Sequence, residues 1–167
     1  YFGRNGLSFN MIRITIGGSD FSSRFYTNDD SLDDDLGLTK FELREEDRLY
    51  KIPLLKLIRT NYAGQWRDAG SLKLFASMWS PPTWMKTNGH FNQGFLKGSI
   101  DAEHRTEPPD NELYFNALAE LKAKFMLAYQ RETGLKFWGL TVMNEPLFAV
   151  QPFLNFNTMI FPQSDYA

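Results

Sequence analysis

Cysteine is absent from the 167 residues of this sequence, which excludes disulfides, thiolate catalysis and cysteine-based zinc sites within the chain. No apolar run approaches the ~20 residues that a membrane-spanning helix needs. An excess of one charge is missing too, because 18 Lys and Arg stand against 20 Asp and Glu and no dense basic tract occurs. The chain therefore lacks the electrostatic footprint of a nucleic-acid-binding protein, and we expect no nucleic-acid partner.

The usual start of a protein is also missing. The chain begins with Tyr1 rather than Met, and it shows neither a signal peptide nor an Asn-x-Ser/Thr glycosylation acceptor. Its first residues run almost at once into an apolar segment, which indicates a segment of something longer. The length by itself favours a single domain.

Aromatic residues, in contrast, are abundant, at 16% of the chain. Aromatic rings fill cores or line pockets for flat apolar faces such as those of sugars. Packing in the core is the simpler interpretation for most of them.

Three short apolar segments predict buried β-strands, at residues 9–16, 72–78 and 136–142. Polar or turn residues follow each of them at once, with the sequences GGSD, WSPP and MNEP. Two helices are expected between the strands. The first covers residues 45–62 and begins or kinks near Pro53. The second covers residues 112–133 and ends at Gly134.

The alternation of strands and helices predicts an α/β fold with a parallel sheet. Such sheets are mainly doubly wound or closed into barrels. No Gly-x-Gly-x-x-Gly motif or phosphate loop follows a strand, which weakens the nucleotide-binding interpretation. Polar and aromatic clusters follow the strands instead, and a (β/α)8 barrel builds its active site from strand ends on one face. We therefore predict a partial TIM barrel of about three βα units.

The segment FWGLTVMNEPLF ends by placing Glu145 between Asn144 and Pro146. A glutamate there can act as a general acid where apolar walls or a second carboxylate raise its pKa. The Asn144 amide can donate to a hydroxyl or accept from one. Retaining hydrolysis of a glycosidic bond needs two carboxyl groups about 5–5.5 Å apart, so Glu145 alone is half of a mechanism. Asn-Glu-Pro alone also fits a simple strand-to-loop turn.

Other residues near the strand ends have structural interpretations as well. Asp20 can cap a helix, and Trp79 and Trp84 can pack in the core or a loop. Arg13 is less ordinary, because an arginine inside an apolar strand needs a buried anionic partner.

Five segments, taken in order, resemble the animal glucosylceramidases of glycoside hydrolase family 30. They are NMIRITIGGSDFSSRFYT, EEDRLYKIPLLK, LFASMWSPPTWMKTNG, LKG and FWGLTVMNEP. The similarity extends over nearly the whole chain, and the WSPPTWMKTNG block together with the NEP motif is specific. The resemblance implies a retaining β-glycosidase on a (β/α)8 barrel with an added β-rich domain.

The resemblance also implies roles for individual residues. Glu145 matches the acid/base of the family, and Asn144 matches the residue that contacts the 2-hydroxyl of the sugar. Asp20 is expected to bind outer hydroxyls of the glucose, and Trp79 to contact the sugar.

Two further residues complete the implied site: Arg13 resembles the family arginine close to the nucleophile, and Phe21 is expected to line the pocket wall. The nucleophile itself, a Glu on the seventh barrel strand of the family, has no counterpart in this chain. Residues 1–167 then form a fragment of a catalytic domain with barrel strands two to four, and the remaining strands and the β-rich domain are absent.

For the full-length protein the resemblance implies hydrolysis of glucosylceramide to glucose and ceramide in the lysosome, as part of sphingolipid catabolism. The isolated segment is expected to be inactive, and no cofactor is implied. The expected partner is a β-glucoside glycolipid, with a membrane surface and an activator protein as candidate partners. Two alternatives stay open: a truncated, non-catalytic product that binds glycan or another protein, and a family 30 hydrolase of another β-linked glycan such as xylan.

Overall fold

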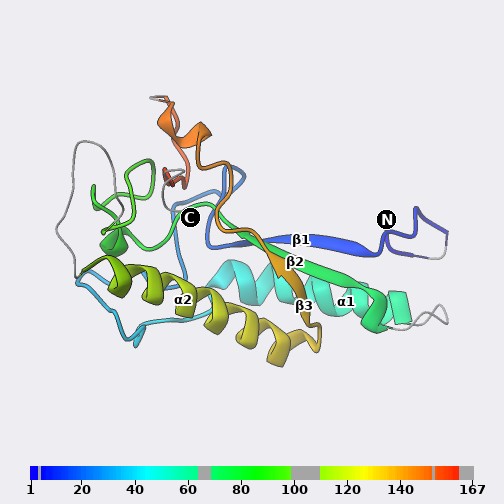
Figure 1. Ribbon diagram of the computed structural model, residues 1–167. Coiled ribbons are helices and arrows are strands. Elements are labelled where there is room, and N and C mark those ends of the chain that lie inside the picture. The colour runs from blue at the N-terminus through cyan, green and yellow to red at the C-terminus, as the bar shows by residue number, and fades with distance from the viewer. Residues whose placement is uncertain (4, 64–68, 99–109, 152, 162–167) are drawn as a thin grey trace.

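The computed structural model describes residues 1–3, 5–63, 69–98, 110–151 and 153–161. Strands and α-helices alternate along it in the order β1 (Met11–Ile16), α1 (Ile52–Ala63), β2 (Lys73–Met78), α2 (Asp110–Thr133) and β3 (Phe137–Leu140). The strands form one parallel sheet in the order β1-β2-β3, so each strand pairs with the next along the chain (Figure 1). The predicted α/β alternation and parallel sheet are confirmed.

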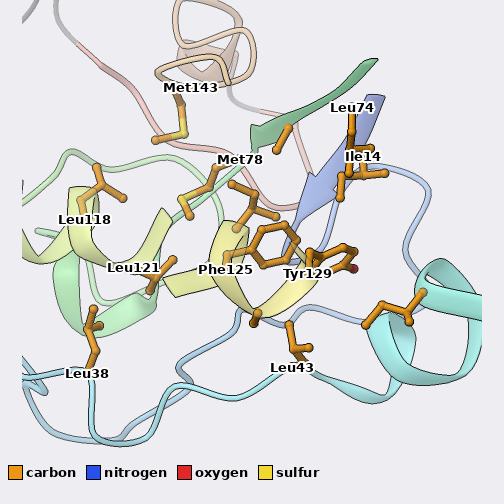
Figure 2. Close-up of a cluster of buried hydrophobic side chains, with 14 of the residues drawn as sticks. Ile14, Leu38, Leu43, Leu74, Met78, Leu118, Leu121, Phe125, Tyr129 and Met143 are labelled. Atoms are coloured by element: carbon orange, nitrogen blue, oxygen red, sulfur yellow. The ribbon is translucent and has the colours of Figure 1, made fainter. Parts of the chain in front are cut away.

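The hydrophobic core lies between one face of the sheet and the two helices (Figure 2). Alternate residues of β1 and β2 are buried there, as the period of two in a strand requires. Helix α2 presents a buried stripe at intervals of three or four residues, which is the spacing predicted from the sequence. The buried residues of these elements include Ile14, Ile16, Leu74, Ala76, Met78, Leu118, Leu121, Phe125 and Tyr129.

The structure confirms two predicted helix boundaries, the one near Pro53 and the one at Gly134. A π-helical turn, η1 (Glu46–Lys51), leads directly into α1, and the regular α-helical pattern starts at Ile52, beside Pro53. Proline cannot donate a backbone hydrogen bond, which explains why the regular pattern starts there. Gly134 ends α2 with φ +69°, and its N–H donates to the Gln130 carbonyl at 2.9 Å.

A buried carboxylate joins η1 to α2 beside the core. Asp47 is fully buried and accepts a hydrogen bond from the Tyr129 hydroxyl at 2.5 Å and one from the Asn28 amide at 2.8 Å. Lys51 pairs with it at 2.9 Å. Burial, and then the neighbouring Asp47 carboxylate, raise the pKa of Tyr129.

The prediction of three buried strands is wrong for β3. Trp138 is 62% exposed and Leu140 is 40% exposed. Trp138 lies on the sheet face opposite the helices, where the Lys73 ammonium is 4.9 Å from its ring centre, and Leu140 lines an open groove beside α2. Strand β3 is also the last strand of the described sheet, with a neighbour only on the β2 side. Among the described residues, the sheet is thus open at β1 and β3 and does not close into a barrel. No helix in the described part of the chain is long and apolar enough to cross a membrane.

Candidate active site

The three strands run parallel, so the chain leaves them at one end of the sheet (Figure 1). The Asn144 N–H donates to the Met78 carbonyl at 2.7 Å, which continues the pairing with β2 beyond the end of β3. Ser77, which precedes Met78, and Thr141, which directly follows β3, share a hydrogen bond of 2.6 Å between their hydroxyls. These contacts bring the Asn-Glu-Pro segment next to the residue that follows β2, Trp79.

Arg13, in the middle of β1, contacts the segments that follow β2 and β3. Its guanidinium donates to the Asn144 side-chain oxygen, and its Cζ lies 4.7 Å from the centre of the Trp79 ring. A planar guanidinium stacks favourably on an indole. Arg13 is exposed, and within the described residues it pairs with a neutral amide and a ring rather than with a buried carboxylate.

The contact with Arg13 also orients the Asn144 side chain toward Glu145. Because its side-chain oxygen accepts from Arg13, its amide nitrogen faces the other way, 3.4 Å from Oε2 of Glu145. An amide has a distinct donor and acceptor end, so the Arg13 contact decides which end meets Glu145.

Glu145 is exposed and has an uncommon backbone conformation, with φ +41°. The left-handed region costs a residue with a side chain about 1–2 kcal/mol. The backbone on both sides holds it there, since the Asn144 N–H binds Met78 and the Phe148 N–H donates to the Glu145 carbonyl at 2.9 Å. In this turn Glu145 is exposed, so a ligand can reach its carboxylate.

Asp20 and Phe21 stand apart from this group. Both are exposed, Phe21 by 95%, and within the described chain neither forms a hydrogen bond, ion pair or ring contact with Arg13, Trp79 or Glu145. Asp20 lines a small pocket of about 280 Å³ between the loop after β1 and the segment after β3. The other residues that line it are Ser19, Ser22, Ser23, Arg24, Phe25, Asn155 and Phe156. Sequence reasoning missed Asn155 and Phe156, which lie in a segment without a clear period.

Two buried lysines were also missed. The Lys86 amine donates to Ser80 Oγ and to the Thr158 carbonyl, and the Lys122 amine of α2 donates to the Val142 carbonyl. Burial lowers the pKa of Lys86 to about 6 and that of Lys122 to about 8. Neither amine reaches the Glu145 carboxylate, but each holds a segment next to the site. The only indication in the sequence that either lysine matters was the position of Lys86 within the WSPPTWMKTNG block.

The described residues contain no group of three or more His, Asp or Glu side chains arranged to hold a metal ion. What this part of the chain does contain is an indole, a guanidinium, an amide and a carboxylate, each in contact with the next. This set can bind hydroxyl groups and transfer a proton, which is the chemistry of carbohydrate hydrolysis.

The family model of the Glycosyl hydrolase family 30 TIM-barrel domain matches residues 1–166. The chain belongs to glycoside hydrolase family 30. Its three-stranded parallel sheet is accordingly part of a TIM barrel, and the resemblance noted from the sequence is confirmed.

Two curated relatives are glucosylceramidases by name. The lysosomal acid glucosylceramidase of Mus musculus is 39% identical over 157 residues, which are 92% of this chain and 27% of the relative. The putative glucosylceramidase 4 of Caenorhabditis elegans is 36% identical over 165 residues, 98% of this chain and 28% of the relative. The family 30 chain thus spans about a quarter of the length of these relatives.

One solved structure with a similar fold is that of a glucanase. The endo-beta1,6-glucanase BT3312 superposes with a TM-score of 0.75 at 26% identity, covering 98% of this chain and 32% of the other. The chain thus belongs to a glycoside hydrolase family, and the relatives named here differ in the substrate that their names give.

Proposed function

We propose that this chain carries the acid/base half of the active site of a retaining β-glucosidase that hydrolyses glucosylceramide. Glu145 protonates the leaving oxygen of the glycosidic bond, and it then takes a proton from the water that cleaves the glycosyl-enzyme ester. The nucleophile of that ester is a second carboxylate, supplied by the full-length protein outside residues 1–167.

The observation that supports this role most is the chain of contacts from Trp79 through Arg13 and Asn144 to Glu145. The exposed carboxylate has an amide donor beside it, and an aromatic ring lies within the same group. In this proposal Asn144 binds the 2-hydroxyl, Trp79 the sugar ring, and Asp20 the outer hydroxyls of glucose. Phe21 takes a place at the pocket wall, and Arg13 lies near the nucleophile.

Glu145→Gln in the full-length protein tests the acid/base role. Without a proton donor, hydrolysis of β-glucosides with poor leaving groups should fall by roughly 10²–10⁴-fold. An activated aryl glucoside needs little protonation and should keep much of its first-step rate. Steady-state and burst kinetics on both substrates measure the difference, with Glu132→Gln on the exposed side of α2 as the control. Wild-type rates of Glu145→Gln on both substrates would rule the role out.

The names of the mouse and nematode relatives support a glycolipid substrate and a place in sphingolipid catabolism for the full-length protein, and that of the mouse relative supports a lysosomal location. A membrane surface and an activator protein are then further partners, since ceramide is a lipid. Glucosylceramide in detergent micelles or anionic vesicles is the substrate that should be cleaved.

Hydrolysis of a β-linked glucan is the second candidate. It is favoured by the structural similarity to the endo-beta1,6-glucanase and by the polar pocket beside Asp20, which suits another sugar better than an acyl chain. The full-length protein should be assayed side by side on glucosylceramide, a β-1,6-linked glucan and xylan. Preference for a polysaccharide would replace the lipid assignment and keep the acid/base one.

A further inference from the structure

A buried lysine connects the loop after β2 with the segment after β3. Lys86 is 1% exposed, and its amine donates to Ser80 Oγ at 3.0 Å and to the Thr158 carbonyl at 2.7 Å. No carboxylate pairs with it among the described residues. A buried lysine without an ionic partner is costly, and the two hydrogen bonds of Lys86 join the turn after β2 to a segment 72 residues further along the chain.

The first acceptor belongs to the turn that carries Trp79. Ser80 is also 1% exposed, and its hydroxyl donates onward to the Pro81 carbonyl at 3.0 Å. The amine, the hydroxyl and the carbonyl form one chain of hydrogen bonds. This chain fixes the backbone directly after Trp79.

The second acceptor belongs to a segment that also contacts the loop after β1. The neighbour of Thr158, Asn157, is buried, and its amide donates to the Tyr26 carbonyl at 3.1 Å. The Gly18 N–H donates to the same carbonyl at 2.9 Å. A Cβ on Gly18 would lie 2.8 Å from the Asn157 side-chain oxygen, so the amide packs directly on the backbone two residues before Asp20.

These contacts form one connection across the site. It leads from Trp79 through Ser80, Lys86 and the Asn157–Thr158 backbone to the loop with Asp20. We propose that Lys86 is a positioning residue of the active site, which keeps Trp79 and Asp20 at a fixed separation by joining the loops that carry them. The inference rests on the proposed function, in which these two side chains bind the sugar.

The role does not require the positive charge. A neutral amine still has two N–H donors, one for Ser80 Oγ and one for the Thr158 carbonyl. The lowered pKa of Lys86 is consistent with this, because the amine keeps both bonds when it loses its third proton. Loss of the amine leaves both acceptors unpaired and frees the two loops to move apart.

Lys86→Met in the full-length protein is the direct test, because methionine fills a similar volume without donors. The KM for an aryl β-glucoside should rise about 10-fold, a change of about 1.4 kcal/mol, while kcat changes far less. The inhibition constant of glucono-δ-lactone should rise by the same factor. Unchanged KM and inhibition constant in folded Lys86→Met would overturn the proposal.

Thr133→Ala is the matched control for lost stability, because Thr133 is buried and its hydrogen bonds, to the Tyr129 carbonyl and from the Leu135 N–H, stay at the end of α2. Thr133→Ala should lower the unfolding temperature and leave the KM unchanged. A rise in KM in Thr133→Ala equal to that in Lys86→Met, at equal loss of stability, would overturn the positioning role. If Lys86→Met does not fold, Ser80→Ala and Asn157→Ala decide, each expected to raise KM severalfold, and wild-type KM in both would contradict the inference.

Calorimetric binding of glucono-δ-lactone separates this inference from the proposed reaction. A wild-type protein that binds the lactone but cleaves no β-glucoside contradicts the proposed reaction, and weaker binding by Lys86→Met would still support the positioning role. A wild-type protein that cleaves β-glucosides with a Lys86→Met variant of equal affinity contradicts the positioning role alone. A wild type without affinity for the lactone contradicts both.

Discussion

At the scale of single residues, the orientation of one amide determines which group faces the Glu145 carboxylate. The Asn144 side chain could present either its oxygen or its nitrogen to Glu145 and to a substrate. Its contact with Arg13 selects the nitrogen, because a guanidinium has donors only. A carboxylate beside an N–H donor is stabilised, whereas the opposite orientation would place two acceptors against each other. Arg13 therefore acts on Glu145 through Asn144.

Arg13→Lys in the full-length protein tests this dependence. Lysine keeps the positive charge but loses the planar group that stacks on Trp79 and the fixed donor geometry toward Asn144. We expect kcat/KM to fall by about 10–100-fold, which corresponds to a loss of about 1.4–2.7 kcal/mol of transition-state stabilisation. Arg131→Lys, at an exposed arginine in the last turn of α2, is the matched control and should change kcat/KM little. Full activity of Arg13→Lys would show that charge alone is enough.

The sequence could identify Glu145 and Asn144 because both stand in one short motif at a strand end. It could not identify Lys86, whose partners Ser80 and Thr158 lie 6 and 72 residues away and belong to segments without a period. The expectation that Arg13 has a buried anionic partner also differs from the structure. Alternation along β1 places Arg13 on the face opposite Ile14 and Ile16, away from the helices, where it is exposed. Contacts between distant loops leave no local pattern that a sequence can show.

At the scale of elements, the α-helices and strands followed from local physics. The apolar stripe of α2 and its glycine cap at Gly134 were predicted within two residues of the observed helix. Each predicted strand was longer than the observed one, because strand ends depend on whether a partner strand continues beside them. The segment after β3 has no clear hydrophobic period, yet its Asn157 and Thr158 hold two other loops. Irregular segments are positioned by tertiary contacts rather than by propensity.

At the scale of the whole molecule, the last strand and the last helix leave apolar surface uncovered. An apolar groove of about 290 Å³ runs between α2 and the chain at β3. Its lining residues are Phe115, Leu118, Ala119, Lys122, Met126, Leu140, Val142 and Phe161. Strand β3 also has hydrogen-bonding groups on the side away from β2, since it pairs with β2 alone in the described sheet. An exposed apolar groove beside an unpaired strand edge promotes association.

Residues 1–167 expressed alone should therefore self-associate at micromolar concentration. Leu140→Lys places a charge on the β3 edge within the groove, and this charge should shift the chain toward monomer because its burial in a contact is unfavourable. Sedimentation velocity over a concentration series measures the shift. Leu32→Lys is the matched control, because Leu32 is 99% exposed on a loop away from the sheet and should leave the distribution unchanged. A monomeric wild-type chain, or equal effects of the two substitutions, would show that the groove and edge do not drive association.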